Sequence, residues 1–464
     1  MNIKTSLPFS SDKMNLPKEK HLYNILEDLE VTIEVTRNPF QLPLDLLFEM
    51  AARINKKRSF LFVSKVLGKH LPVNPHVSLL SGAALGILYQ QQCGGRSEHR
   101  IEDIIEGFYQ EDKAEEIYRN LKSRPLAVKE PTLFIGFAET ATALGHSMFD
   151  IFSGPTKYVH TTRDCIAEVE PVLQFEEEHS HATAHRCYAQ SDFFTGDEPV
   201  VLIDDEITTG RTALNIIQDL HQKYPRNQYV IASLLDWRSD QDILRFHEVE
   251  QQLGITISTL SLIQGSISVS GSPIEAGAPA NEGTLKESKA QIYNHPVGHF
   301  FEHYRYSSLH SADQVNTLPY LKSTGRFGMT GADISGLDQQ VDACASYLEQ
   351  KRMGSRTLCL GTGEFMYIPM RIAAQMGQGI SYQSTTRSPI HPSPEDTYAI
   401  HHVYPFDCPE DGSIPNFFYN ITGDLYDEIF VFMEREKDRL RLTPLLQALE
   451  STKVNRIHIV DLAT

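Results

Sequence analysis

The segment VVLIDDEITTGRTA, residues 200–213, decides how the chain should fold. It opens with four apolar residues, a run short enough for a buried parallel strand and rich in β-branched side chains. The adjacent carboxylates Asp204 and Asp205 follow, at the strand end outside which open α/β sheets bind ligands. After them comes a small-residue loop, and then apolar residues recur at helical spacing: Ala213, Leu214, Ile216, Ile217 and Leu220. The segment predicts strand, loop and helix, with a site in the loop.

The loop itself has the composition of a phosphate-binding turn. It consists of Glu206, Ile207, Thr208, Thr209, Gly210, Arg211 and Thr212. Hydroxyl donors and backbone N–H groups would surround an anion at the positive end of the helix dipole. Asp204 and Asp205 would repel a phosphate in direct contact. We therefore expect them to accept hydrogen bonds from sugar hydroxyls or to hold Mg²⁺ indirectly, through water and ligand.

Taken as one string, residues 200–212 resemble the fingerprint of the type I phosphoribosyltransferases: an apolar strand, two acids, two further residues, Thr-Thr-Gly, any residue, Thr. The resemblance implies an α/β fold with a parallel sheet, phosphoribosyl pyrophosphate (PRPP) as substrate and Mg²⁺ as cofactor. It also implies that residues 208–212 bind the 5′-phosphate and that Asp204 and Asp205 orient the ribose. Glu206 replaces an apolar residue frequent in the wider family and has no assigned role. The alternative is an ordinary strand–turn–helix capped by a threonine.

Composition limits the classes of protein. A chain of 464 residues predicts two or three domains, and 41% hydrophobic with 22% charged residues is usual for globular proteins. The formal charge of −18 disfavours a nucleic-acid polymer as partner. Six scattered cysteines without a C-x-x-C pair favour reduced thiols in a cytoplasm. The sequence has neither an apolar leader nor a membrane-spanning run, so we expect no membrane partner.

Two more strand ends offer anion-binding groups. The run TLFIG, residues 132–136, leads into Gly136, Phe137, Ala138, Glu139 and Thr140, a turn that can bring its backbone close to an anion. In the resembling family a loop at this place contacts pyrophosphate. A strand at 158–160 leads to Arg163, placed to bind phosphate bidentately; the alternative is a surface ion pair.

The stretch 175–186 has three acids and three histidines and is expected to lie outside the core. The family resemblance places a mobile catalytic loop here, usually basic. Arg186 and charged histidines could substitute for its basic residues. Zinc binding by His179 and His181 is the competing interpretation.

Flanking segments carry weaker signals. Residues 1–20 are expected to form a flexible tail, 44–54 a helix and 60–63 a strand. The basic turn 64–70 presents Lys65, Lys69 and His70 either to a phosphorylated ligand or partner subunit, such as a homodimer contact, or simply to solvent. Trp237 could stack on an aromatic base, although packing is favoured.

Residues 265–290, rich in Gly, Ser, Ala and Pro, predict a linker, and a repeat follows it. TLCLGTGE at 357–364 parallels TLFIGFAE at 132–139, and Thr-Thr-Arg recurs at 385–387. The second half should therefore hold a similar α/β unit, with later strands at 428–433 and 456–460. It lacks the acid pair and the Thr-Thr-Gly string. It is either a decayed duplicate or a second anion site, for which the candidates are Gly361, Thr362, Gly363, Arg387 and Arg326.

The motif Thr-Arg-Ser-Pro at 386–389 adds a second resemblance. The chain resembles a bacterial family that joins an orotate phosphoribosyltransferase-like domain to a C-terminal domain named TRSP after this motif and that is found with tellurite-resistance gene clusters. The resemblance implies a nucleotide-like small molecule as product. We expect a tail (1–20), a phosphoribosyltransferase domain with a hood (21–264), a linker (265–290) and a TRSP-type domain (291–464).

These expectations define an enzyme that moves 5-phosphoribosyl from PRPP to an unidentified nitrogenous acceptor. Arg163, Arg186, Asp204 and Asp205 are the expected catalytic residues. Two alternatives stay open: a non-catalytic regulator that binds PRPP, and a phosphorylase or hydrolase acting on a ribosyl phosphate.

Overall fold

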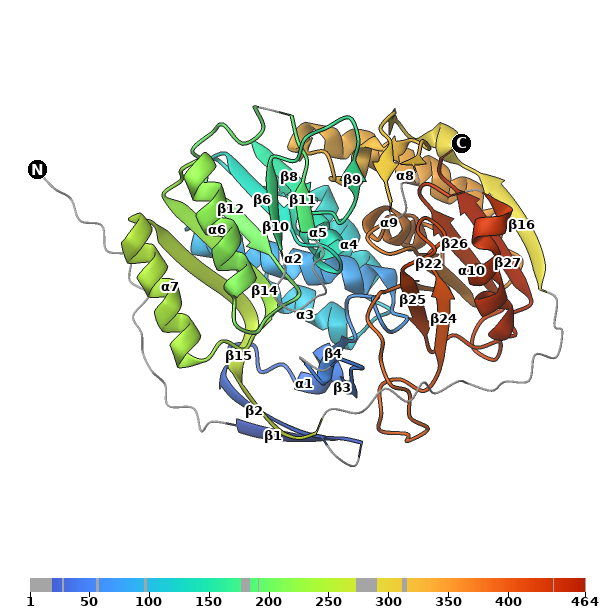
Figure 1. Ribbon diagram of the computed structural model, residues 1–464, viewed down its shortest axis with the longest axis horizontal. Coiled ribbons are helices and arrows are strands. Elements are labelled where there is room, and N and C mark those ends of the chain that lie inside the picture. The colour runs from blue at the N-terminus through green and yellow to red at the C-terminus, as the bar shows by residue number, and fades with distance from the viewer. Residues whose placement is uncertain are drawn as a thin grey trace, which may run out of the picture.

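Two largely parallel sheets form the architecture of the protein, one from each half of the chain except that the short strand β21 of the second half joins the first sheet (Figure 1). The structure is a computed structural model that describes residues 19–26, 29–55, 58–95, 98–176, 184–190, 192–272, 290–310, 315–436 and 438–463. No helix in these ranges is both long and apolar enough to cross a membrane.

The first sheet has the order β1-β2-β15-β14-β12-β6-β8-β21, with neighbours from β15 to β8 running parallel and the outer pairs antiparallel. All four residues of β12 are buried, as a central parallel strand requires. The strands are β1 (Glu19–Ile25), β2 (Leu29–Arg37), β6 (Thr132–Gly136), β8 (Thr156–His160), β12 (Val200–Ile203), β14 (Gln228–Asp236), β15 (Thr256–Gly271) and β21 (Met329–Thr330).

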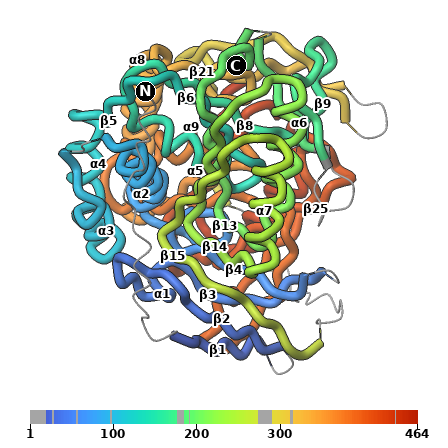
Figure 2. Tube along the Cα trace, turned by 90° about the vertical axis from the view of Figure 1, so that its left-hand side faces the viewer, coloured from blue at the N-terminus to red at the C-terminus, as the bar shows by residue number. Residues whose placement is uncertain are grey.

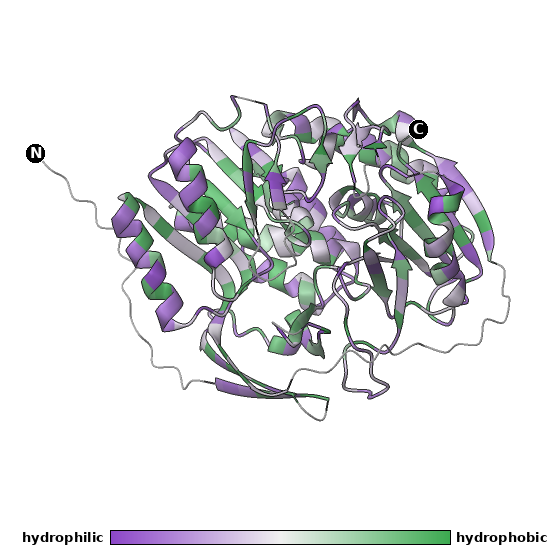
Figure 3. Ribbon diagram, viewed as in Figure 1, coloured by the Kyte–Doolittle hydropathy of each residue, from purple (hydrophilic) through white to green (hydrophobic). Residues whose placement is uncertain are grey.

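Helices cover both faces of this sheet. The helices α6 (Arg211–Lys223) and α7 (Asp240–Leu253) lie on one face, and α2 (Pro75–Gln92) lies on the other (Figure 2). Coloured by hydropathy, the strands between them are largely apolar, whereas α6 and α7 are largely hydrophilic (Figure 3). Hydrophobic burial of the sheet between these layers is the main term that stabilises the unit.

The second sheet has the order β16-β27-β26-β22-β23 and is parallel throughout. Its strands are β16 (Gln291–Pro296), β22 (Thr357–Gly361), β23 (Ile380–Ser384), β26 (Glu428–Met433) and β27 (Arg456–Asp461). Its helices are α8 (Ile334–Glu349), α9 (Tyr367–Gln375) and α10 (Arg439–Ser451), and an antiparallel pair, β24 (Val403–Asp407) and β25 (Pro415–Tyr419), precedes β26.

The repeat predicted from the sequence is present in three dimensions. The unit β6–α5–β8, with α5 at Ala141–Phe149, has its counterpart in β22–α9–β23. β6 lies between β8 and β12, just as β22 lies between β23 and β26. The strand, helix and strand β12–α6–β14 likewise match β26–α10–β27. The strands predicted at 428–433 and 456–460 are confirmed.

The two units share one continuous hydrophobic core, which α2, α5 and α9 join. Gly82 in α2 allows a close crossing, since a Cβ there would lie 2.5 Å from the Cβ of Ser147 in α5. The ring of His146 stacks on Tyr367 at 3.6 Å, and buried Arg371 donates to the Asp150 carboxylate at 2.8 Å. The second unit is therefore docked firmly on the first.

Shorter elements complete the chain. They are α1 (Leu44–Leu47), β3 (Phe48–Ala52), β4 (Phe60–Ser64), α3 (Ile101–Tyr109), α4 (Ala114–Ser123), β5 (Leu126–Ala127), β7 (Phe152–Ser153), β9 (Cys165–Ile166), β10 (Leu173–Glu176), β11 (Ala184–Cys187), β13 (Glu206–Ile207), β17 (His303–Tyr304), β18 (Ser308–Leu309), β19 (Val315–Asn316), β20 (Tyr320–Leu321) and the short 3₁₀ turns η1 (Gly298–Phe300), η3 (Lys322–Thr324) and η4 (Gly331–Asp333).

Some sequence expectations were wrong in their boundaries. The helix expected over 44–54 is one turn, α1, after which β3 pairs with β4; packing of Phe48 edge-to-face on Phe62 outweighs the helical spacing. Residues 265–271, expected in the linker, instead continue β15, because β2 supplies a strand partner. The rest of the expected linker, residues 273–289, lies outside the described residues. Residues 1–18 of the expected tail also lie outside them.

Candidate functional site

The fingerprint loop lies at the carboxyl end of β12, between two neighbouring strands. The Asp204 N–H donates to Ala232 O in β14 at 3.0 Å, and the Asp205 N–H donates to the Asp204 carboxylate at 3.0 Å. Glu206 and Ile207 pair with the end of β14 as β13, and α6 then begins at Arg211. The loop therefore leads directly into a helix N-terminus, where the first N–H groups lack helical partners.

Hydroxyl groups of the loop are available to a ligand. The Thr209 hydroxyl accepts from the Arg211 N–H at 3.4 Å. The side chains of Thr208 and Thr212 are partly exposed, and neither makes a hydrogen bond to any part of the chain that the structure describes. Arg211 is exposed at the start of the helix. The arrangement fits a phosphate group, which accepts several such bonds.

Gly210 is a structural requirement of this loop. It caps α6 with φ +70°, and a Cβ there would lie 2.5 Å from the Phe246 ring. We expect Gly210→Ala to lower the free energy of unfolding by about 2–4 kcal/mol, from left-handed backbone strain plus overpacking. Gly254→Ala is the matched control, because Gly254 has φ +68° but open space around it. Denaturant unfolding of both variants checks this; equal losses would contradict the close approach to Phe246.

The carboxyl groups after β12 carry unbalanced negative charge. Burial raises the pKa of Asp205 and of Glu206, and Arg58, which pairs with Glu206, opposes the shift. A cation brought in with an anionic ligand would relieve this repulsion, and carboxylate oxygens suit Mg²⁺. Within the described ranges no group of three or more His, Cys, Asp and Glu residues is arranged to hold a metal by itself. The donor set therefore fits Mg²⁺ bound mainly through the ligand.

The predicted pyrophosphate turn lies beside the fingerprint loop. The Phe137 N–H donates to Ile203 O at 3.1 Å, and the Ala138 N–H donates to the Thr161 hydroxyl at 2.8 Å. The ends of β6, β8 and β12 are thereby tied together. Gly136–Thr140 occupies the sheet edge expected of it.

Glu139 gives this turn an unexpected charge. Its carboxylate is buried against Lys69 at 3.2 Å, with the Arg163 guanidinium 3.9 Å away. Burial alone would raise the pKa of Glu139, but Lys69, Arg163 and Arg387 hold it at about 2. The turn therefore presents an ionised carboxylate next to the expected pyrophosphate position.

Lys69 corrects the expectation for the basic turn 64–70. Its side chain is 1% exposed, and its ammonium also donates to Gly363 O at 3.1 Å and Thr385 O at 2.8 Å. His70 is buried as well, and burial with the neighbouring Lys69 lowers its pKa to about 3. The Lys69 ammonium, expected at a ligand or partner surface or in solvent, instead joins the two units, because it contacts Glu139 of the first and the backbone of the second. Lys65, only 38% exposed, pairs with Glu49 at 3.1 Å.

Arg163 and Arg186 lie at the carboxyl-end edge of the first sheet, on the side that faces the second unit. The Arg163 N–H and the Thr162 hydroxyl donate to the Glu364 carboxylate at 2.9 and 2.6 Å. The Arg186 guanidinium donates to Arg163 O at 3.1 Å. The mirrored bond from the Thr386 hydroxyl to Glu139 is 3.4 Å. Each repeat thus inserts its glutamate into the Thr-Thr-Arg turn of the other.

A cavity of about 280 Å³ opens at this junction. Its lining includes Arg163 and Arg186 from the first unit and Thr362, Gly363, Arg326 and Arg387 from the second. Gly361 lies behind it, where a Cβ would press on Phe365 O at 2.8 Å. The structure therefore divides the predicted set: the two aspartates belong to the fingerprint loop, whereas both arginines join the candidate second-unit site.

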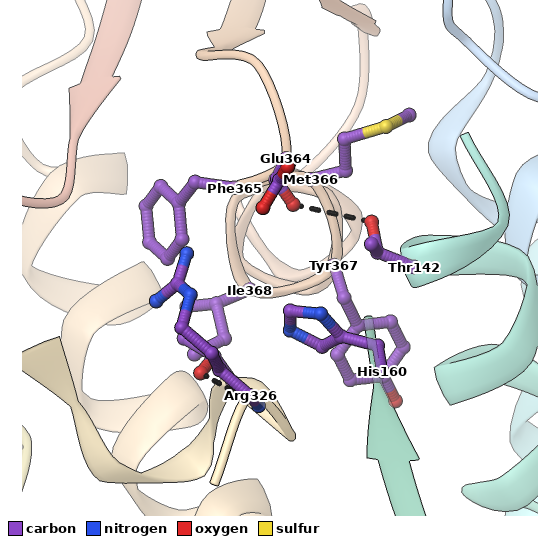
Figure 4. A pocket seen from close by; sticks show the side chains of 9 residues that line it. Thr142, His160, Arg326, Glu364, Phe365, Met366, Tyr367 and Ile368 are labelled. Atoms are coloured by element: carbon purple, nitrogen blue, oxygen red, sulfur yellow. Dashed lines mark hydrogen bonds between the residues drawn. The ribbon is translucent and has the colours of Figure 1, made fainter. Parts of the chain in front are cut away.

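A smaller cavity behind it is too small for a ligand. Figure 4 shows its lining around the start of α9, with Thr142 donating to the backbone oxygen of Glu364 at 3.1 Å. His160 points into it, and burial with nearby Arg326 lowers its pKa to about 3, so it is neutral. The volume of about 10 Å³ admits a single water at most.

Trp237 and two rings of the hairpin β10–β11 have packing roles. Trp237, 3% exposed, stacks on Phe62 at 5.4 Å, which supports packing over base stacking. In the hairpin β10–β11 the rings of Phe175 and His185 stack at 5.4 Å and are buried, so the expectation that 175–186 lies wholly outside the core was wrong at these residues. His179 and His181, the candidate zinc ligands, lie outside the described residues.

The sequence analysis did not identify the charged residues Arg58, Glu139 and Glu364 that contact the predicted site residues. The ion pair between Arg58 and Glu206 could not be predicted, because Arg58 lies in a polar stretch without a motif. Glu139 and Glu364 could have been predicted, because both occupy the same position of the repeat. A glutamate present in both copies indicates that the two residues have the same structural role.

Comparisons with known proteins agree with this geometry. Residues 47–266 match the family described as "Phosphoribosyl transferase", and residues 323–449 match the "TRSP domain C terminus to PRTase_2". No curated protein matches the sequence.

Similar solved structures include the adenine phosphoribosyltransferase of Trypanosoma brucei in complex with AMP, pyrophosphate and ribose-5-phosphate, at 12% identity over 50% of this chain and 82% of that chain, with a TM-score of 0.27. The enzyme of Leishmania donovani shares 19% identity over 33% and 67%, with a TM-score of 0.22. That of Saccharomyces cerevisiae shares 15% over 34% and 80%, with a TM-score of 0.20.

Residues 47–266 therefore form a phosphoribosyltransferase domain built on a largely parallel α/β sheet, and a second parallel-sheet α/β region follows it in the chain. In particular, the chain joins a phosphoribosyltransferase domain to a C-terminal TRSP domain.

Proposed function

We propose that the protein transfers the 5-phosphoribosyl group of PRPP to a nitrogenous small-molecule acceptor, within a nucleotide-like biosynthetic or stress-resistance pathway. The observation that carries the proposal is the fingerprint loop: two acids at the end of β12, partly exposed threonine hydroxyls and a glycine that opens α6. A ligand with a phosphate beside two hydroxyls satisfies all of these groups.

In the proposed complex, residues 208–212 hold the 5′-phosphate and Asp204 with Asp205 accept hydrogen bonds from the ribose hydroxyls. The backbone of 136–140 and the side chain of Arg163 face the pyrophosphate, with Arg186 behind Arg163. Mg²⁺ bound to the ligand would neutralise the pyrophosphate, and the aspartates would orient it indirectly.

The reaction is a displacement at ribose C1. A bond from the acceptor nitrogen to C1 forms, the C1–O bond to pyrophosphate breaks, and the bonding pair leaves with pyrophosphate. The acceptor loses its proton to solvent or to a basic group. Since the transition state resembles an oxocarbenium ion, the residues accelerate it by positioning and by electrostatic stabilisation more than by acid–base chemistry.

Pyrophosphate release from PRPP, measured with a panel of nucleobases and with cell extract, tests the proposal. Release that depends on one acceptor identifies a transferase. Release of pyrophosphate without an acceptor indicates a hydrolase instead, and a phosphate-dependent reaction of a ribosyl phosphate indicates a phosphorylase. Absence of any turnover, with PRPP still bound, would contradict an enzymatic role.

One observation favours a non-catalytic PRPP-binding regulator as the second candidate. The carboxylate of Glu139 lies 3.9 Å from Arg163 and competes with pyrophosphate for this arginine.

The variants Arg163→Ala and Arg186→Ala separate the two candidates. For a transferase we expect each variant to lower kcat by about 10- to 1,000-fold, because each removes positive charge near the leaving group. Turnover assays with saturating PRPP measure this. A wild-type protein that binds PRPP without releasing pyrophosphate would support the regulator.

A further inference from the structure

The cavity between the units lies where the second sheet would bind a ligand. Its walls include residues that follow three adjacent parallel strands: Thr362 and Gly363 after β22, Arg387 after β23 and Glu434 after β26. In open α/β sheets ligands bind outside these carboxyl ends. The position matches that of the fingerprint loop in the first unit, since β26 is the counterpart of β12.

Its chemistry differs from that of the first unit. Glu434 stands where the acid pair follows β12, but the Arg326 guanidinium binds both of its oxygens at 2.9 and 3.0 Å. Arg435 is buried and donates to Ser308 Oγ and Asn316 O. Among the described residues after β26, these contacts replace the run of threonine hydroxyls that follows β12, so this part of the second unit does not reproduce the phosphate loop of the first.

Two charged groups in the lining are left for a ligand. Arg387 and Glu410 both line the cavity, and neither makes a hydrogen bond or ion pair within the ranges that the structure describes. Glu139 and Glu364 influence Arg387 electrostatically from beyond ion-pair distance. Glu410 is partly exposed, and Arg435 is its main favourable neighbour. Among the described lining residues, Arg387 and Glu410 thus offer one unpaired cation and one unpaired carboxyl group to the same cavity.

The overall charge of the lining does not favour a strongly anionic ligand. The described lining includes four arginines and five carboxyl groups, and its histidine, His310, is kept uncharged because burial lowers its pKa. A phosphate dianion would therefore meet no excess of positive charge in this lining. Apolar walls, Phe365 and Phe406 among them, suit a carbon skeleton, and about 280 Å³ holds roughly nine atoms of the size of water.

We propose that this cavity is a second binding site, for a small amphoteric molecule of the α-amino acid class, whose carboxylate pairs with Arg387 and whose amino group pairs with Glu410. The site does not depend on the proposed phosphoribosyl transfer. Arg163 and Arg186, which form part of its wall, connect it to the pyrophosphate side of the first unit.

Calorimetry on the full chain tests the site with defined probes: glycine, L-alanine, L-leucine and L-glutamine as amphoteric molecules, acetate and methylammonium as their halves, and inorganic phosphate. We expect at least one amino acid to bind at least tenfold more tightly than either half. Arg387→Gln and Glu410→Gln should each weaken it by roughly 10- to 100-fold, since each removes one charge-assisted contact. Glu115→Gln with Arg119→Gln, an exposed ion pair on α4, is the control and should change nothing.

The pH dependence supplies an independent check. Burial raises the pKa of Glu410 to about 7, Asp164 and Glu434 add to the shift, and Arg435 and Arg326 oppose it. Because only the ionised carboxylate pairs with an ammonium group, affinity for the amino acid should rise from pH 6 to pH 8. In Glu410→Gln this rise should be absent.

Three results would overturn the proposal: no heat from any amino acid, tighter binding of phosphate than of the amino acids, or equal affinity in Arg387→Gln and in the wild type. Thermal unfolding of each variant confirms that it is folded. Asp204→Asn with Asp205→Asn should retain amino-acid binding, so failure of the PRPP site and failure of this site are distinguishable.

Discussion

Pyrophosphate release should fall by about 10²- to 10⁴-fold when Asp204 and Asp205 are both replaced by Asn. Each carboxylate is expected to accept a charge-assisted hydrogen bond from a ribose hydroxyl, worth about 1.5–3 kcal/mol, and 1.36 kcal/mol corresponds to a factor of ten. Asn keeps the shape of the side chain but has no charge. Steady-state rates at saturating acceptor measure the loss.

The fold should tolerate this change. Burial already raises the pKa of Asp205, so the native site gains stability when this group is neutral. We expect the double variant to unfold at a temperature equal to or above that of the wild type. The matched control is Asp219→Asn, on the helix α6 that follows the loop. Turnover reduced less than tenfold in the double variant would contradict the assigned role of the two aspartates.

The largest effect on stability is expected at the junction of the units. Asp150, fully buried, accepts from Arg371 at 2.8 Å, from Tyr118 at 2.9 Å and from Lys122 at 2.9 Å. Asp150→Ala leaves Arg371 buried without this partner. The expected loss in the free energy of unfolding is about 3–5 kcal/mol. Urea unfolding of the full chain measures it.

A double variant separates the buried charge from packing. Asp150→Leu with Arg371→Met replaces the ion pair by apolar side chains, and such exchanges are often neutral. We expect the double variant to be more stable than Asp150→Ala. If both lose the same free energy, packing and not the unpaired charge limits the junction.

The Asp150 carboxylate also predicts that the protein loses folding stability at low pH. Burial alone would raise the pKa of Asp150, but Arg371 and Lys122 lower it well below its usual value. Its contribution to stability is therefore complete above the unfolded pKa near 4 and is lost as the pH falls further. Asp150→Ala should accordingly lose less stability than the wild type between pH 4 and pH 2.

The parts of the fold that follow from local pattern could be predicted from the sequence. The apolar run at 200–203 is short and continuous because β12 is buried on both faces, and the repeat at 357–364 signalled the second sheet. Residues 44–54 have helical spacing, but β4 stabilises an extended chain there, and no local pattern announces a partner strand. Residues 265–271 have linker composition and pair with β2, far away in sequence.

The chemistry of the candidate site could be predicted from the sequence, but which of its residues lie together in the structure could not. A strand, two acids and a glycine-containing loop are contiguous, so the sequence brings them together. Arg163 and Arg186 also lie near the first sheet, yet docking of the second unit places them on the wall of a shared cavity. Lys69 shows the same limit: a lysine next to a glycine predicts exposure, and only the contact with the second unit buries it.

Titration calorimetry of the wild-type protein with PRPP in the presence of Mg²⁺ tests the central claim most directly. The account predicts one PRPP bound per chain, with affinity at least tenfold weaker in Asp204→Asn with Asp205→Asn. No heat of binding, or an affinity that the double replacement leaves unchanged, would contradict it.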